Sequence, residues 1–161
     1  MLVQRELRRR LRAERSSIFF EPCLPRLALR PPAGADWIHE IKHDGFRILA
    51  QRDASRVRLS TRNGYDFSER FPLIVAAIVA LPVHSCAVDG EAIACDKNGL
   101  SVFEMIRWRQ HDRSVTLCAF DLIELDGEDL RRKAIEERKR LLAKLLAAAR
   151  PGIALNQKPK W

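Results

Sequence analysis

The segment "SVTLCAFDLIELDG" (114–127) is the most strand-like stretch of the sequence, because apolar, β-branched and aromatic residues follow one another until an Asp-Gly turn. Two further strands are predicted before it, at 45–53 and 55–62, with a short polar turn between them near Asp53. Strands joined by so short a turn run antiparallel. A mainly antiparallel sheet is therefore the expected centre of the fold.

Three other segments have weaker strand patterns. Residues 37–43 alternate crudely between apolar and polar side chains and are predicted to form a strand. Residues 85–96 fit either a strand pair or one bulged strand, because Gly90 interrupts the apolar pattern, and glycine within a strand marks a bulge or a close approach to a ligand. The short apolar segment at 153–157 is a candidate for one more strand.

Helices are predicted between these strands. The first covers 68–82, with Ser68 as its N-cap and Pro72 in its first turn, where proline is tolerated. A short amphipathic helix is predicted at 101–111, and a longer one with a clear apolar face at 134–150. Because helices alternate with strands that are joined by tight turns, without regular βαβ crossovers, the expected class is α+β with helices flanking the sheet.

Composition places the chain among globular proteins. It has 161 residues, enough for one domain with a sizeable core or for a piece of a larger one. Its longest apolar run, at 73–83, is too short to span a bilayer, and its arginine-rich beginning lacks the apolar stretch of a secretion signal. The four cysteines are scattered without a CxxC pair, which argues for reduced thiols in a cytoplasm and against structural zinc.

Positive charge is concentrated at the start of the chain. The formal net charge is +8, and residues 1–15 hold six arginines against two glutamates, which is half of the excess. A basic chain favours polyanionic partners such as nucleic acid or nucleotides. The alternative is that these residues form a tail that only aids solubility.

Four residues at strand-like positions are candidates for chemistry, although each has a simpler explanation alone. Lys42 in "HEIKHDGFR" (39–47) reads first as a lysine beside an ordinary Asp-Gly turn. Glu91 has small and apolar neighbours but would more often face solvent, and Phe120 is most simply a core residue. Asp121 lies inside an apolar strand, where an unpaired carboxylate would cost several kcal/mol, so it is expected to be paired or to face a cleft.

The order of four short motifs resembles that of the ATP-dependent DNA ligases, members of the covalent nucleotidyltransferase superfamily. The motifs are "KHDGFR" (42–47), "TRNG" (61–64), "VDGEAIA" (88–94) and "FDLIELDG" (120–127), and the lead-in "LPRLALRPPAGADW" (24–37) is similar to the ligase domains of bacterial end-joining enzymes. The resemblance implies a partial adenylation domain at 20–161 with an ATP-grasp-like nucleotidyltransferase fold. It follows a basic segment at 1–19 and comes without an OB-fold domain.

The resemblance implies that Lys42 is the nucleophile that attacks the α-phosphate of ATP, forms lysyl-AMP and releases pyrophosphate. AMP then passes to a DNA 5′-phosphate, and the 3′-hydroxyl seals the nick, in DNA repair or recombination. The implied cofactors are ATP and Mg²⁺, and the implied partner is nicked or broken double-stranded DNA, with no membrane. The other implied site residues are Glu40 for the adenine amine, Arg47 near the ribose and nick, Arg62 for phosphate, Glu91 for the ribose hydroxyls, and Phe120 stacked on adenine.

The later motifs of the family are missing from this sequence, which ends at "NQKPKW" (156–161) without the Glu-Gly motif whose glutamate binds the metal. No metal ligand is therefore assigned, and a C-terminally truncated domain is expected. Because electrostatic stabilisation is usually the largest catalytic term, its partial loss predicts weak ligation by the chain alone. A partner chain that supplies the missing motifs would restore it.

Three functions remain open from the sequence. The first is a DNA ligase adenylation domain, and the second is a catalytically weak remnant that only binds nucleotide or DNA. The third is an RNA ligase or a capping-type guanylyltransferase, against which the lead-in segment argues.

Overall fold

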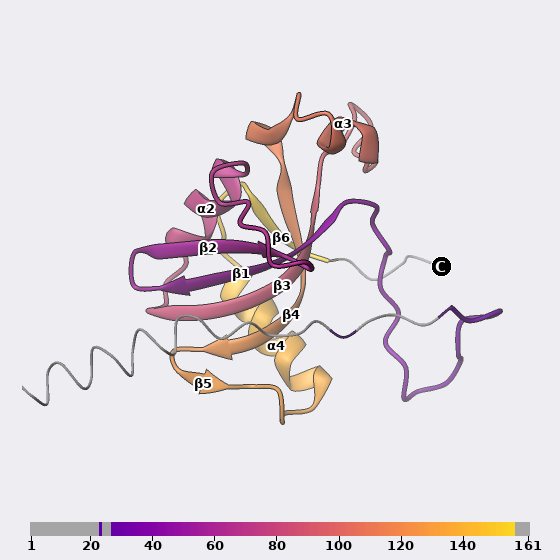
Figure 1. Cartoon of the computed structure of the whole chain (residues 1–161). Coiled ribbons are helices and arrows are strands. Elements are labelled where there is room, and N and C mark those ends of the chain that lie inside the picture. Colours follow the sequence, from indigo (N-terminus) through magenta and orange to yellow (C-terminus); the bar gives the residue numbers. More distant parts are fainter. Residues whose placement is uncertain (1–22, 24–26, 157–161) are drawn as a thin grey trace, which may run out of the picture.

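The computed structural model describes Cys23 and residues 27–156, so the predicted basic segment at 1–19 lies outside the described residues. One sheet forms the centre of the fold, with the order β2-β1-β3-β4-β5 and with β6 on β4 (Figure 1). Its strands are β1 (Phe46–Asp53), β2 (Arg56–Thr61), β3 (Ser85–Ile93), β4 (Thr116–Leu125), β5 (Glu128–Asp129) and β6 (Ile153–Leu155). All neighbours pair antiparallel except β4 and β6, which run parallel. The predicted α+β class with a mainly antiparallel sheet is confirmed.

The helices occur where they were predicted but are shorter. They are α2 (Pro72–Val79), α3 (Phe103–Arg107) and α4 (Ile135–Leu146), with a 3₁₀ turn η1 (Asp112–Ser114) before β4. Pro72 does lie in the first turn of α2, but the predicted Ser68 cap is wrong, because α2 begins after Phe71 without a side-chain cap. Ser68 instead accepts a hydrogen bond from the Leu59 amide and donates one to Asp66, so it fixes the turn before the helix.

The predicted strand at 37–43 is also wrong. This stretch is extended but joins no ladder among the described residues. The reason is that β1, the strand that follows it directly, already pairs with β2 on one side and with β3 on the other. β1 therefore has no open edge to which this stretch could add. Trp37 and Ile41 are 56% and 40% exposed, so the crude alternation reflects no buried strand face.

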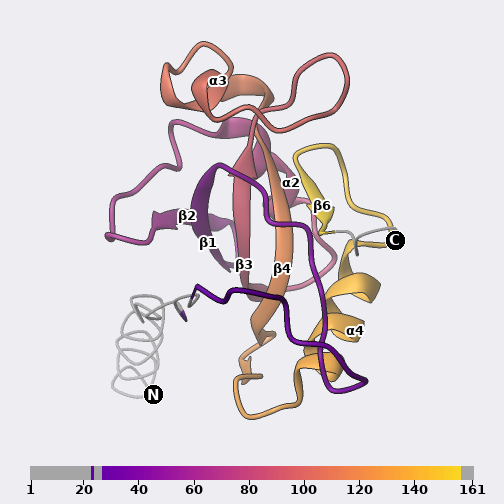
Figure 2. The ribbon, with the colours of Figure 1, turned by 90° about the vertical axis from the view of Figure 1, so that its right-hand side faces the viewer.

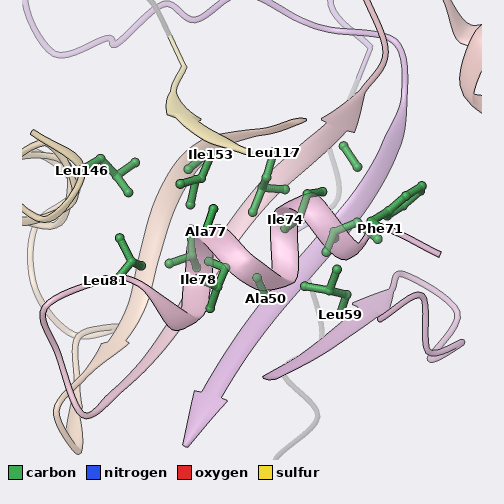
Figure 3. Packing of buried hydrophobic residues seen from close by; sticks show 14 of the residues in the cluster. Ala50, Leu59, Phe71, Ile74, Ala77, Ile78, Leu81, Leu117, Leu146 and Ile153 are labelled. Atoms are coloured by element: carbon green, nitrogen blue, oxygen red, sulfur yellow. The ribbon is translucent and has the colours of Figure 1, made fainter. Parts of the chain in front are cut away.

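Apolar side chains fill one face of the sheet. Ile74, Ala77 and Ile78 of α2 pack against residues of β1, β2, β4 and β6, and the buried leucines of α4 belong to the same cluster (Figure 3). Figure 2 shows α2 behind the sheet, α4 beside β4, and the segment 27–45 passing in front of the sheet. The face opposite α2 is therefore the face on which a site can form.

Strand register places polar residues together on that face. Arg47 pairs with Glu91, Leu49 with Asp89, and Asp89 with Asp121, and paired positions share a face. The register shifts between Asp89 and Gly90, which confirms the predicted bulge. A Cβ at Gly90 would lie 2.7 Å from the Cys118 carbonyl oxygen, so the glycine permits close contact between β3 and β4.

Two further expectations concern thiols and membranes. The four cysteines are unpaired, as the scattered spacing predicted. Within the described part of the chain, no helix is long and apolar enough to cross a membrane.

Candidate adenylation site

A pocket of about 500 Å³ opens where β1, β2 and β3 meet the turn after β2. That volume lies within the range of small-molecule sites. The pocket brings together three of the predicted site residues, Arg47, Arg62 and Glu91. Its other lining residues are Gly45, Phe46, Thr61 and Asn63. Lys42 is exposed and lies three residues before Gly45, at the chain segment that leads into the pocket wall.

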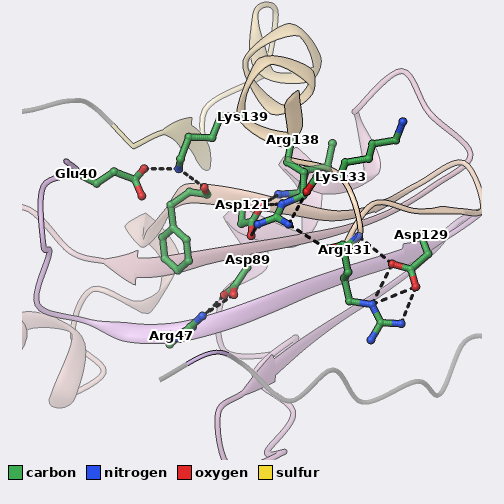
Figure 4. A network of polar contacts seen from close by, with 11 residues as sticks. Glu40, Arg47, Asp89, Asp121, Asp129, Arg131, Lys133, Arg138 and Lys139 are labelled. Carbon is green, nitrogen blue, oxygen red and sulfur yellow. Dashed lines mark hydrogen bonds and ion pairs between the residues drawn. The ribbon is translucent and has the colours of Figure 1, made fainter. Parts of the chain in front are cut away.

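Arg47 is held by a buried carboxylate. Its Nε and Nη2 donate to the two oxygens of Asp89 at 3.1 and 2.7 Å, and Asp89 is buried (Figure 4). Burial raises the pKa of Asp89, which the Arg47 charge opposes, and the hydrogen bonds to Asp89 raise the pKa of Arg47. The Arg47 guanidinium also lies 5.4 Å from the centre of the Phe120 ring. Arg47 is thus a fixed charge that links the pocket to the predicted adenine-stacking residue.

Glu91 links the pocket to the segment that carries Lys42. Burial raises the pKa of the Glu91 carboxyl, while a hydrogen bond from the Gly45 backbone and the charges of Arg47 and Lys42 act in the opposite direction. The hydrogen bond from Gly45 ties Glu91 to the chain segment that carries Lys42. Glu91 is part-buried and lines the pocket, so it lies on the face of the sheet away from the apolar core.

Gly45 explains why the nucleophile segment carries an Asp-Gly pair. A Cβ at this position would lie 2.1 Å from the Ala92 carbonyl oxygen. Only glycine lets the chain pass this close to β3. The pair therefore brings the chain at Gly45 against β3, in addition to turning it.

Glu40 and Phe120 are joined by a residue that the sequence did not single out. Lys139 of α4 donates to the Glu40 carboxylate at 2.7 Å and to the Phe120 carbonyl oxygen at 2.6 Å (Figure 4). Phe120 is half-buried outside the apolar core, so its simpler assignment as a core residue is wrong. The only sequence signal for Lys139 was a charged position on the polar side of a predicted helix.

Asp121 is paired, as its position in an apolar strand predicted. Arg138 of α4 donates to both of its oxygens, at 2.9 and 3.1 Å (Figure 4). The pair fixes α4 beside β4 and gives Asp121 a structural role. Arg138 and Lys139, adjacent residues of α4, therefore bind Asp121 and Glu40 respectively.

The described residues contain no group of three or more His, Cys, Asp or Glu side chains that could hold a metal ion. The donor set therefore does not fit a protein-bound metal on its own.

Comparison with known proteins identifies the family. The family described as the ATP-dependent DNA ligase domain matches residues 25–160. The chain belongs to this family. The multifunctional non-homologous end-joining protein LigD of Pseudomonas aeruginosa is 36% identical over 128 residues, which cover 78% of this chain but 15% of that protein. This ligase-family chain therefore spans a small part of the relatives that it matches.

Two solved structures show the same fold in the ligase family. The ligase domain of LigD from M. tuberculosis has a TM-score of 0.62 at 30% identity, covering 74% of this chain and 40% of the solved one. A mycobacterial DNA ligase D complexed with ATP and MES has a TM-score of 0.61 at 30% identity, covering 71% of this chain and 38% of the solved one. The predicted family and the nucleotidyltransferase fold are confirmed, and ATP is the nucleotide of the family.

Proposed function

We propose that this chain is the part of an end-joining DNA ligase that transfers AMP from ATP to Lys42. The observation that carries the proposal is the position of the "KHDGFR" segment (42–47), whose last three residues line the pocket together with Arg62 and Glu91. Lys42 is the first residue of the same segment. Two arginines and one carboxylate suit a nucleotide, because cations can bind phosphate oxygens while a carboxylate can accept hydrogen bonds from ribose hydroxyls.

The proposed step joins an amine to a phosphorus atom. The Lys42 Nζ attacks the α-phosphorus of ATP, the phosphorus–nitrogen bond forms, and the bond to the pyrophosphate oxygen breaks. The attacking nitrogen needs its lone pair, so the ammonium first gives up one proton to solvent. A second proton leaves the nitrogen as the phosphorus–nitrogen bond forms, to solvent or to the departing pyrophosphate. Negative charge develops on the phosphoryl oxygens and the leaving group, and we assign its stabilisation to Arg62, which lines the pocket.

The adenine is assigned to the other end of the site. Phe120 offers a half-buried ring beside Arg47, and Glu40 is tied to the Phe120 backbone by Lys139. Stacking on such a ring would contribute about 1 kcal/mol beyond the burial of area. We assign the adenine amine to Glu40 and the ribose hydroxyls to Glu91.

The proposal also includes Mg²⁺, nicked DNA and a partner chain. Mg²⁺ typically enters such sites on substrate phosphates with one or two carboxylates, so we place it on the triphosphate. The later transfer of AMP to a 5′-phosphate at a nick is assigned to an assembly in which a partner chain supplies the remaining ligase motifs. A cytoplasmic location stays a prediction.

Covalent labelling tests the proposal directly. The chain is incubated with Mg²⁺ and ATP labelled at the α-phosphate, then denatured and run on a gel, with α-labelled GTP in parallel. We expect ATP-dependent label on the protein, displaced by added pyrophosphate and transferred to a duplex with a 5′-phosphorylated nick when the remaining motifs are supplied. No label on folded protein would leave only nucleotide or DNA binding, and label from GTP alone would indicate a guanylyltransferase.

Lys139→Met is expected to weaken the preference for adenine. The change keeps the length of the side chain but removes the hydrogen bonds to Glu40 and to the Phe120 carbonyl. Loss of one charge-assisted hydrogen bond corresponds to about a tenfold effect. We expect the KM for ATP in self-adenylation to rise about tenfold and the ATP-to-GTP ratio to fall. Lys144→Met on the exposed side of α4 is the matched control, and equal effects in the two variants would contradict the assignment.

A further inference from the structure

Asn156, directly after β6, contacts the residue on each side of Lys42. Its Nδ2 donates to the Ile41 carbonyl oxygen at 3.0 Å, and its Oδ1 lies 3.1 Å from His43 Nε2. The carbonyl of Ile41 can only accept, so the amide nitrogen must face it and the amide oxygen must face His43. His43 then donates through Nε2. The Asn156 side chain therefore hydrogen-bonds to the residues immediately before and after the proposed nucleophile. We call these two contacts the clamp.

The backbone of Asn156 is itself fixed to the sheet. Its amide donates to the Ala119 carbonyl oxygen at 2.8 Å, and β6 pairs with β4 from Leu117 to Ala119. The start of β6 is equally constrained, because a Cβ at Gly152 would lie 2.4 Å from the Leu73 carbonyl oxygen. The clamp is thus attached to β4, and the start of β6 lies against α2.

The clamp matters because the segment it holds has no ladder of its own. Residues 37–43 pair with no strand among the described residues, and Lys42 itself is exposed. Glu40 is anchored by Lys139, and Gly45 donates a hydrogen bond to Glu91. Between these two anchors, Asn156 supplies the contacts to Ile41 and His43.

We propose that Asn156 is a positioning residue for Lys42, which it aligns for in-line attack by fixing the Ile41 carbonyl and the His43 ring. The proposal rests on the proposed function, in which Lys42 is the nucleophile. A misplacement of about 1 Å at a reacting group can cost about a hundredfold in rate. A positioning role therefore affects the rate of adenylation more than the binding of ATP.

The test compares Asn156→Ala and Asn156→Asp with Asn98→Ala, which removes an exposed amide on the turn after β3. We expect the maximal rate of self-adenylation to fall tenfold to a hundredfold in both Asn156 variants, with the KM for ATP and the melting temperature nearly unchanged. Asn156→Asp keeps an acceptor for His43 but loses the donor to Ile41, so it tests the contact to Ile41 by itself. His43→Ala should lower the rate, and adding it to Asn156→Ala should cause less further loss than it does alone.

Hydrogen exchange gives a second readout that does not need activity. Amides in 39–45 should exchange faster in Asn156→Ala than in the parent, while those of β1 and β3 stay protected. Unchanged exchange in 39–45, or a loss of rate explained wholly by a lower melting temperature, would overturn the clamp. Absence of label in the parent would overturn the proposed function instead, and the exchange result would still decide for or against the clamp.

Discussion

Lys42→Arg is expected to abolish covalent attachment of AMP, with a loss of more than about a thousandfold in rate. Arginine keeps the positive charge but stays protonated in proteins, so it offers no lone pair to phosphorus. The pocket formed by Arg47, Arg62 and Glu91 is untouched by the change. ATP should therefore still bind while no label appears, as measured by calorimetry and by α-phosphate labelling of the same preparation.

The matched control is Lys97→Arg, an exposed lysine on the turn after β3. It should label at the parent rate. Label that persists in Lys42→Arg at a comparable rate would show that another residue accepts AMP. Loss of both label and ATP binding would instead point to damage of the whole pocket.

Arg47→Met is expected to lower the free energy of unfolding by about 2–4 kcal/mol at neutral pH, because it leaves the buried Asp89 carboxylate without its partner. Methionine keeps most of the apolar part of the arginine side chain. Chemical denaturation of parent and variant measures the difference. Arg58→Met is the control. It removes the ion pair between Arg58 and Asp66, whose side chains are both about half exposed, so it should change stability little.

The loss of stability caused by Arg47→Met should depend on pH. Burial raises the pKa of Asp89, and Arg47 opposes that shift. A group whose pKa is raised by folding stabilises the fold below its unfolded pKa and loses that contribution as pH rises through the folded value. Removing Arg47 raises the pKa of Asp89 further, so the destabilisation should grow from acidic to neutral pH.

The double variant Arg47→Met with Asp89→Asn is the control for this prediction. It replaces both charges, so it should recover part of the lost stability and remove most of the pH dependence. A double variant that is as unstable as the sum of the single ones would contradict the proposed coupling.

Local patterns were sufficient to predict most of the sheet and the family. β1, β2 and β4 follow from short polar turns and continuous strand residues, and the motif order led to Lys42, Arg62 and Glu91. The same patterns failed at 37–43, because alternation alone does not say whether an edge of the sheet is open to receive a strand. The Ser68 cap failed because the hydroxyl is engaged by Asp66 and Leu59.

The supporting contacts of the site were not predictable in the same way. Lys139 is 99 residues from Glu40, and Asn156 is 115 residues from Ile41. No local period or turn signal links positions so far apart. These contacts depend on where α4 and β6 pack beside β4, and that placement comes from burial of apolar faces in the folded domain.

Mapping the modified residue by mass spectrometry tests the central claim most directly. The chain is incubated with ATP and Mg²⁺, digested under conditions that preserve phosphoramidates, and searched for AMP on every lysine. We expect AMP on Lys42 alone. AMP on another lysine, or none on folded protein that binds ATP, would contradict it.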